Sequence, residues 1–340
     1  MALTWVPERP GNWLFHCHML GHMMPDPHGA SGHHVADAAA AGMAGLVLGI
    51  HVTGDGLAAT TPGMPRRNLQ LIVELADRHD TISSYTVNLV DPAGPAPRLS
   101  YRGVPGPVMV LTRGEPVAVE VVNRLTAPTA IHWHGIELES YDDGVPDFGG
   151  HAGSITPAVA PGGRFTARFT PPRAGTFIYH THWHDPGQLA AGIYGPLIVL
   201  EPGETYDPAR DHIIVLGFDG PYVEAPGEPL VVNGENPPRP LELQAGVAHR
   251  LRLINITPDN VALTVQLLSG FDPLKWTLVG KDGAATPASQ RTTRAARQLV
   301  SVGETYDFEV APLPPTPVGM WLELRRGSGE LLFQWPVRVR

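Results

Sequence analysis

The stretch Asn12-Trp-Leu-Phe-His16-Cys17-His18-Met-Leu-Gly-His22 holds the only cysteine of the chain, between two histidines and five residues before a third. Side chains alternate between the two faces of a β-strand. Cys17 can therefore face one metal ion while His16 and His18 face another on the opposite side. Two imidazoles, a thiolate and a weak thioether are the ligands of a blue-copper electron-transfer site. The alternative, a buried structural thiol with incidental histidines, is disfavoured by the rest of the chain.

The same pattern recurs further along the chain. Residues 4–18 align without gaps with residues 168–182, and each segment predicts a strand, a Pro/Gly turn and a strand that ends in His-x-His. The first of these strands is expected around residues 3–6 in the N-terminal segment. A second alignment pairs residues 114–123 with residues 246–255. His132 and His134 follow the first of these segments, whereas Thr264 and Gln266 stand at the same offsets after the second. Such a fixed internal period indicates a domain repeat.

The repeating unit has two halves, each able to contribute one His-x-His pair. Residues 60–202 contain both halves, residues 203–340 contain both without histidine pairs, and residues 1–59 contain only the second half. By this alignment roughly one hundred residues of the first unit are absent. Half a sandwich would expose unpaired strand edges, so we expect association with another copy that completes the partial unit.

Composition supports a β-rich protein. Glycine (38) and proline (36) are abundant and aliphatic runs are short, which favours many short strands and turns. Alternating stretches such as residues 117–122 suit half-buried strands of a sandwich. The net charge is −9 with no basic cluster, so nucleic acid is an unexpected partner. No segment reaches the roughly 18 apolar residues of a membrane span, and residues 1–10 lack the features of a signal peptide.

Three paired motifs resemble those of the multicopper oxidases, the laccase-like family. They are His16-Cys17-His18 with His22, His132-Trp-His134-Gly, and His180-Thr-His182. The flanks Asp143-Gly-Val-Pro and residues 192–199 are similar as well, and the segments 250–255 and 303–307 resemble the copper-free middle domain of the family. The resemblance implies cupredoxin-type Greek-key sandwiches, two complete and one partial. The family's HxxHxHG motif has no match here, and the cysteine motif comes first rather than last.

The resemblance implies copper as the cofactor and assigns its ligands. Cys17 and His22 would bind the type 1 copper. His132 would bind the type 2 copper of a trinuclear cluster. The type 3 pair would be held by His134, His180, His182, His16 and His18. The axial ligand of the type 1 copper is expected to be Met43, with Met24 or no axial ligand as the alternatives, because residues 25–41 read as an insertion.

The sequence indicates the roles of other residues near these motifs less specifically. Asp143 lies where bacterial relatives carry an acid that delivers protons to reduced oxygen, but Asp-Gly also favours a tight turn by itself. His184 extends the third motif and could be a spare ligand, although a surface or supporting role is favoured. His28, His33 and His34 lie in the insertion and read as part of a loop.

The resemblance implies a copper oxidase that takes electrons one at a time from a small reductant and reduces O₂ to water. Phenols, aromatic amines or metal ions would be the reductants, in the periplasm or outside the cell. Two alternatives remain at this point. One is a copper-binding protein without activity, favoured by the missing motif. The other is an enzyme like copper nitrite reductase, which also pairs a type 1 copper with a histidine-only copper.

Overall fold

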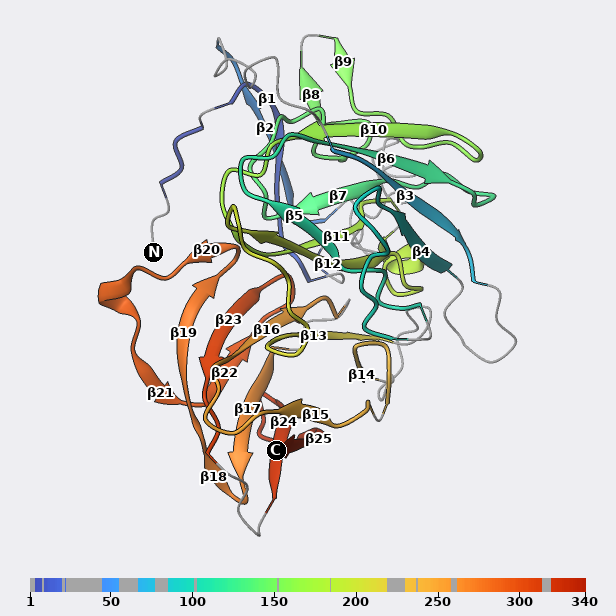
Figure 1. Cartoon of the computed structure of the whole chain (residues 1–340). Helices are drawn as coiled ribbons and strands as arrows, with labels where there is room; N and C mark the ends of the chain where they lie inside the picture. The colour runs from blue at the N-terminus through green and yellow to red at the C-terminus, as the bar shows by residue number, and fades with distance from the viewer. Residues whose placement is uncertain are drawn as a thin grey trace.

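The computed structural model describes residues 4–7, 9–19, 22, 45–54, 67–76, 85–100, 103–151, 153–183, 185–218, 230–236, 238–257, 262–313 and 319–340. These residues form an all-β, cupredoxin-like fold with five sheets. Figure 1 shows β1–β12 in the upper half of the molecule and β13–β25 in the lower half. The helical elements of the described part are short: α3 (Asp185–Gln188) and η1 (Ala288–Gln290). Among these residues no helix is long and apolar enough to cross a bilayer.

The first sandwich packs two four-stranded sheets face to face. The order of one sheet is β10 (Arg164–Phe169), β6 (Val117–Asn123), β3 (Arg67–Leu75), β4 (Tyr85–Val90). The order of the other is β5 (Met109–Thr112), β12 (Tyr194–Leu200), β11 (Gly175–Thr181), β7 (Ile131–His134). Their inner faces share one apolar core that includes Leu71, Val119, Trp133 and Tyr179. The alternation of apolar residues on β3 and β6 produces this core, because every second side chain faces inward.

The second sandwich is built in the same way from the last third of the chain. One sheet runs β14 (Leu230–Val232), β13 (Asp211–Phe218), β16 (His249–Asn255), β23 (Thr305–Val310), β19 (Lys275–Lys281), β20 (Ala284–Ala285), with β21 (Thr293–Ala295) also on β19. The other runs β15 (Leu241–Leu243), β25 (Leu331–Val339), β24 (Met320–Arg326), β17 (Leu263–Ser269), β18 (Asp272–Pro273), with β22 (Arg297–Val300) also on β17. Trp276 and Phe308 stack in its core with ring centroids 4.0 Å apart.

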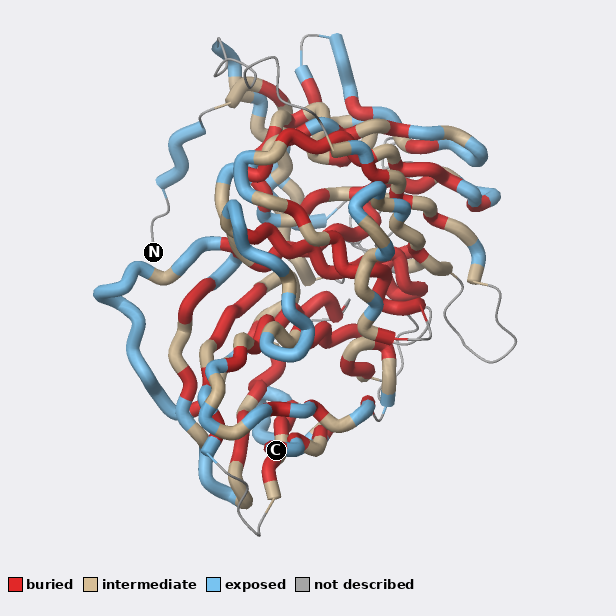
Figure 2. Tube along the Cα trace, in the orientation of Figure 1, coloured by how far each residue is buried: buried red, intermediate tan, exposed pale blue. Residues whose placement is uncertain are grey.

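The two sandwiches share a third apolar cluster. Ile178 and Ile198 from the first sandwich pack with Val215 and Ile254 from the second, and all four side chains are almost fully buried. Figure 2 shows buried residues in the middle of each half and at the junction between the two halves. The second sandwich therefore covers the outer face of the sheet that contains β11 around Ile178 and Ile198, and this part of the face is not exposed to solvent.

The N-terminal segment forms a hairpin that lies on the first sandwich. β1 (Gly11–His16) pairs with β2 (Val47–Val52), and β1 also meets β8 (Gly150–His151), which pairs with β9 (Ser154–Ile155). The expected strand around residues 3–6 is wrong for its described part, since residues 4–6 have no strand structure. The corresponding strand of the complete unit, β10, is held by hydrogen bonds to β6. Residues 4–6 have no such strand partner in the described part of the chain.

Candidate metal centre

Two adjacent strands place three histidines on one face, and a fourth follows the end of the second strand. β7 and β11 are antiparallel, and their register sets His132 opposite His180 and Trp133 opposite Tyr179. Because side chains alternate along a strand, Trp133 and Tyr179 enter the core while the histidines point to the other side. The ligand nitrogens of His132, His134 and His180 all lie within 4.8 Å of one another. His182 continues the line, with its ring centroid 5.3 Å from that of His132.

The N-terminal hairpin brings two more histidines to this face. The ring of His16 lies 5.6 Å from that of His182, and the ring of His18 lies 4.7 Å from that of His134, both centroid to centroid. His16 and His18 stack on each other at 4.9 Å. The segment therefore approaches the other two motifs, as the assignment of all six histidines to one cluster requires. The assignment of each ring to a particular copper stays a prediction.

Asn12 anchors the hairpin in this position. Its side-chain Nδ2 donates to the carbonyl oxygen of Phe148 at 2.8 Å, and its backbone oxygen accepts a hydrogen bond from Ser140 Oγ at 2.5 Å. Its Oδ1 lies 2.7 Å from Nδ1 of His51 on the paired strand. Asn12 thus joins both strands of the hairpin to the first sandwich. The sequence motif gave no signal for this role, because Phe148 and Ser140 lie 136 and 128 residues away.

Backbone carbonyl groups fix several rings. In three of the histidines, Nδ1 lies within hydrogen-bond distance of a backbone carbonyl oxygen. The distances are 2.9 Å from His132 to Asp143 O, 2.6 Å from His180 to Thr181 O, and 3.2 Å from His16 to Cys17 O. A ring that donates from Nδ1 keeps its Nε2 lone pair for a metal. These carbonyl partners are the kind of supporting contact that orients metal ligands, and the sequence motifs do not reveal them.

The side chain of Asp143 also lies beside the histidine cluster. Its Oδ1 is 3.2 Å from Nδ1 of His132. The next residue, Gly144, has φ +80°, and a Cβ atom there would lie 1.8 Å from the carbonyl oxygen of Ile131. Only glycine allows the loop to approach β7 so closely. The Asp-Gly pair therefore forms the turn that its composition predicts, and the turn holds Asp143 against His132.

Burial makes these imidazoles neutral. The pKa values of His134, His180 and His182 lie well below the usual histidine value, chiefly because burial disfavours the charged form and also because the rings lie close together. Burial likewise lowers the pKa of His18 to about 4. Neutral rings offer lone pairs, which is the form that binds metal ions. Nδ1 of His182 is buried and has no protein hydrogen-bond partner among the described residues.

The residues near Cys17 form a second, separate group. Cys17 Sγ lies 3.4 Å from Nδ1 of His22. The backbone N–H of Cys17 donates to Leu46 O at 3.1 Å, and that of Leu46 donates to His22 O at 2.7 Å. A thiol and an imidazole are thus held together by the base of the hairpin. Met43, Met24, His28, His33, His34 and His184 lie outside the described residues.

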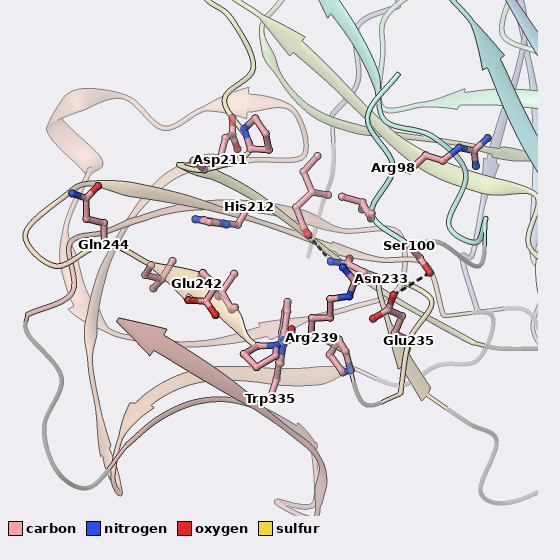
Figure 3. A pocket seen from close by; sticks show the side chains of 18 of the residues that line it. Arg98, Ser100, Asp211, His212, Asn233, Glu235, Arg239, Glu242, Gln244 and Trp335 are labelled. Carbon is pink, nitrogen blue, oxygen red and sulfur yellow. Dashed lines mark hydrogen bonds between the residues drawn. The ribbon is translucent and has the colours of Figure 1, made fainter. Parts of the chain in front are cut away.

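The donor sets fit copper. A cluster of neutral imidazoles and a thiol paired with an imidazole are both ligand types that copper prefers, whereas calcium and magnesium prefer oxygen ligands. A cavity of about 900 Å³ lies elsewhere, between the second sandwich and the loop of Arg98 and Ser100. Figure 3 shows His212, Arg239 and Trp335 in its wall, and none of the six histidines described above lines it. The candidate metal centre therefore does not lie in this cavity.

Comparison with known proteins agrees with this geometry. Residues 100–204 match the family described as multicopper oxidase. The chain is 37% identical over 138 residues to a copper resistance protein A homolog of Pseudomonas syringae pv. tomato, an alignment that covers 40% of this chain and 22% of the relative. It is 38% identical over 141 residues to laccase-2 of Cryptococcus neoformans var. grubii, covering 39% of this chain and 22% of that protein.

Solved structures extend the likeness beyond the matched segment. The crystal structure of a multicopper oxidase from Pseudomonas thermotolerans superposes with a TM-score of 0.60 at 25% identity, covering 82% of this chain and 65% of that one. The blue copper oxidase of Nitrosomonas europaea gives a TM-score of 0.59 at 22% identity, with 81% and 86% covered. The alignments span about a fifth of the length of the two curated relatives above. Residues 100–204 thus match the multicopper oxidase family, and the motifs and fold of the chain are similar to those of that family.

Proposed function

We propose that the chain binds copper at two neighbouring sites and serves a laccase-like oxidase reaction. The observation that carries the proposal is the convergence of six histidines from three segments, with Cys17 and His22 next to them in sequence. His132, His134, His180, His182, His16 and His18 would hold a trinuclear cluster. Cys17 and His22 would hold a type 1 copper, for which Met43 or Met24 remains the expected axial ligand. When bound, copper supplies one-electron redox chemistry and the reduction of O₂ to water.

The protein's own residues connect the two sites. Cys17 is joined through its backbone to His16 on one side and His18 on the other, and Nδ1 of His16 lies within hydrogen-bond distance of the Cys17 carbonyl oxygen. The path between the thiol and the histidine cluster therefore runs through the backbone of residues 16–18. Burial excludes water from His180 and His182. Asp143, held beside His132, is the group that we propose delivers protons.

The reductant is proposed from chemistry and from the relatives. Laccases and copper resistance proteins both match this chain, so phenolic compounds and metal ions are the two classes of donor to test. The experiment compares oxidation of a phenol and of Cu(I) by copper-loaded protein, with oxygen uptake as the readout. Loss of O₂ uptake in Cys17→Ser, with cluster copper retained, would support the two-site scheme. O₂ uptake unchanged by that substitution would contradict it.

A copper-binding protein of low activity is the second candidate. The described residues bring only Cys17 and His22 to the type 1 site, and the sequence lacks the HxxHxHG motif. We therefore expect the chain by itself to be a poor oxidase. Robust turnover with full copper loading would show that other residues replace the missing ligands. A nitrite reductase-like centre is less favoured, because its histidine-only copper needs fewer ligands than the six histidines gathered here.

A second copy of the chain is the proposed partner of the hairpin. Phe15 and Leu48 stand opposite each other on β1 and β2, and they are 60% and 57% exposed. β2 has no neighbour on its outer edge among the described strands, whereas β12, which follows β11 in the complete unit as β2 follows β1, also pairs with β5. Analytical ultracentrifugation tests the association: Phe15→Lys should shift the protein toward monomer. A monomeric parent protein would contradict the proposal.

A further inference from the structure

The turn that contains Gly303 in the second sandwich lies directly against His18. A Cβ atom on Gly303 would lie 2.1 Å from Nδ1 and 2.8 Å from Cε1 of that ring. Non-bonded heavy atoms sit best at about 3.5–4.0 Å, so any side chain at this position must displace the imidazole or the turn. Gly303 also has φ +80°, which glycine adopts without strain.

The turn cannot easily move away from the ring. The N–H of Gly303 donates to the carbonyl oxygen of Asn255 at 2.8 Å, and the N–H of Asn255 donates to Glu304 O at 3.2 Å. The side chain of Asn255, which is fully buried, also donates to Val300 O at 2.9 Å. These hydrogen bonds tie the turn to the end of β16 in the core of the second sandwich.

On its other side, His18 is enclosed by the histidine cluster. Its ring stacks on His16 at 4.9 Å and meets the edge of His134 at 4.7 Å, both centroid to centroid. Gly303 therefore closes the side of the ring that carries Nδ1. That contact leaves Nε2 as the nitrogen available to a metal.

The same short segment also holds the strand that carries His180. The hydroxyl of Thr305 donates to the carbonyl oxygen of Thr176 on β11 at 2.9 Å. The hydroxyl of Thr176 in turn donates to Oδ1 of Asp307 at 2.5 Å. Oδ2 of Asp307 accepts from Nη1 of Arg252, which is 2% exposed, at 3.0 Å. β11 is thus attached to the second sandwich four residues before its first histidine.

We propose that residues 303–307 are a positioning element for the copper cluster. Gly303 sets the position of the His18 ring, while Thr305 and Asp307 set the position of β11 and hence of His180. The second sandwich, which contributes none of the candidate copper ligands, would in this way hold two ligand-bearing segments in place. This inference rests on the proposed copper function of the histidines.

The first experiment compares Gly303→Ala with Gly114→Ala. Gly114 has the same φ of +80°, but a Cβ atom there meets nothing within 4 Å. Both variants carry the cost of a non-glycine residue at positive φ, and only Gly303→Ala should push His18. We expect the copper content per chain, measured by elemental analysis after loading and desalting, to fall in Gly303→Ala and to match the parent protein in Gly114→Ala.

The second experiment needs no metal and so separates this inference from the proposed function. The urea midpoint of metal-free protein is measured for His18→Ala, Gly303→Ala and the double variant. If the alanine methyl group collides with the imidazole, Gly303→Ala should lower the midpoint less in the His18→Ala background than in the parent. The Gly114→Ala shift should be the same in both backgrounds.

Two results would overturn the proposal, and a third would separate it from the proposed copper function. Equal copper content in Gly303→Ala and the parent protein would overturn it, as would strict additivity of His18→Ala and Gly303→Ala in the urea series. If the parent protein binds no copper while the two substitutions are coupled, the contact between Gly303 and His18 stands and the proposed copper function fails.

Discussion

Cys17 Sγ lies 3.4 Å from Nδ1 of His22, while the rings on either side of it in the sequence stack at 4.9 Å and meet the His-x-His pairs of the first sandwich. One short segment therefore serves two neighbouring groups of ligands. The alternation of side chains along an extended backbone explains the arrangement, because neighbouring residues point in opposite directions. The path between the two groups passes through the backbone of Cys17 itself.

Replacing Cys17 with serine should remove the intense visible thiolate-to-copper absorption of the copper-loaded protein. The reason is that Cys17 is the only thiol in the chain. The visible spectrum of Cys17→Ser is compared with that of His51→Ala, whose ring contacts Asn12 rather than the candidate ligands. A blue colour that persists in Cys17→Ser would exclude this residue as the type 1 ligand.

Copper should stabilise the protein through the histidine cluster. A ligand at a hundred times its dissociation constant stabilises the native state by about 2.7 kcal/mol. We expect copper to raise the melting temperature of the parent protein, and most of that gain should vanish in His132→Ala/His180→Ala. The matched control is His212→Gln, which changes a histidine outside the cluster. An equal thermal shift in the double variant would place the copper elsewhere.

Residues 203–340 should contribute no tight copper site. Thr264 and Gln266 take the places of the His132 and His134 pair, and Gln266 instead donates to Glu323 Oε2 at 2.9 Å. A variant of the chain with alanine at His16, His18, His22, His132, His134, His180 and His182, and with serine at Cys17, should therefore retain no stoichiometric copper by titration. Circular dichroism establishes that the variant is folded. Tight binding of one equivalent by this variant would refute the alignment of the repeats.

Arg252→Ala should be strongly destabilising. The guanidinium bonds both carboxylate oxygens of Asp211 at 2.6 and 2.7 Å and also bonds Asp307, so its removal leaves buried carboxylates unpaired. Breaking such a buried pair costs about 3–5 kcal/mol, whereas an exposed pair such as Arg164 with Glu120 contributes about 0–1 kcal/mol. Urea unfolding of Arg252→Ala and Arg164→Ala measures the difference. Equal losses would mean that the buried network adds little.

Stability should fall as the pH is lowered from about 6.5 to 4. Burial, and next the neighbouring His249 ring, lower the pKa of His212 to about 4, although Asp211 and Asp207 oppose the shift. Because the unfolded state takes up the proton at a higher pH, the contribution of His212 is fully present above pH 6.5 and is lost as the pH falls toward 4. The shift corresponds to roughly 3 kcal/mol.

Substituting His212 with glutamine should flatten this part of the pH profile. The change removes the titrating ring that lies 3.0 Å from Nδ1 of His249. Thermal unfolding at a series of pH values is compared with that of the parent protein and of His51→Ala, an exposed ring. If the parent and His212→Gln lose stability in parallel between pH 6.5 and 4, the acid sensitivity has another origin.

Much of the fold follows from local patterns in the sequence. Alternating apolar residues produce β3, because a strand with one buried face requires a period of two. The His132 and His134 pair has the same period, so the two rings share a face of β7. Thr264 and Gln266 lie on one strand, β17, as His132 and His134 lie on β7. The prediction of a strand around residues 3–6 is wrong for residues 4–6. A strand also needs a hydrogen-bonded neighbour, and no local pattern supplies one.

The sequence by itself determined which residues could bind a metal and which face of each strand they occupy, since both depend on side-chain chemistry and on the period of the backbone. Only the tertiary structure decided how the rings are held. The Asn12 anchor, the hydrogen bond of His132 to the Asp143 carbonyl and the contact of Gly303 with His18 join residues that are distant in sequence or depend on the path of a loop. Such contacts arise from the packing of separate sheets, which no short-range pattern encodes.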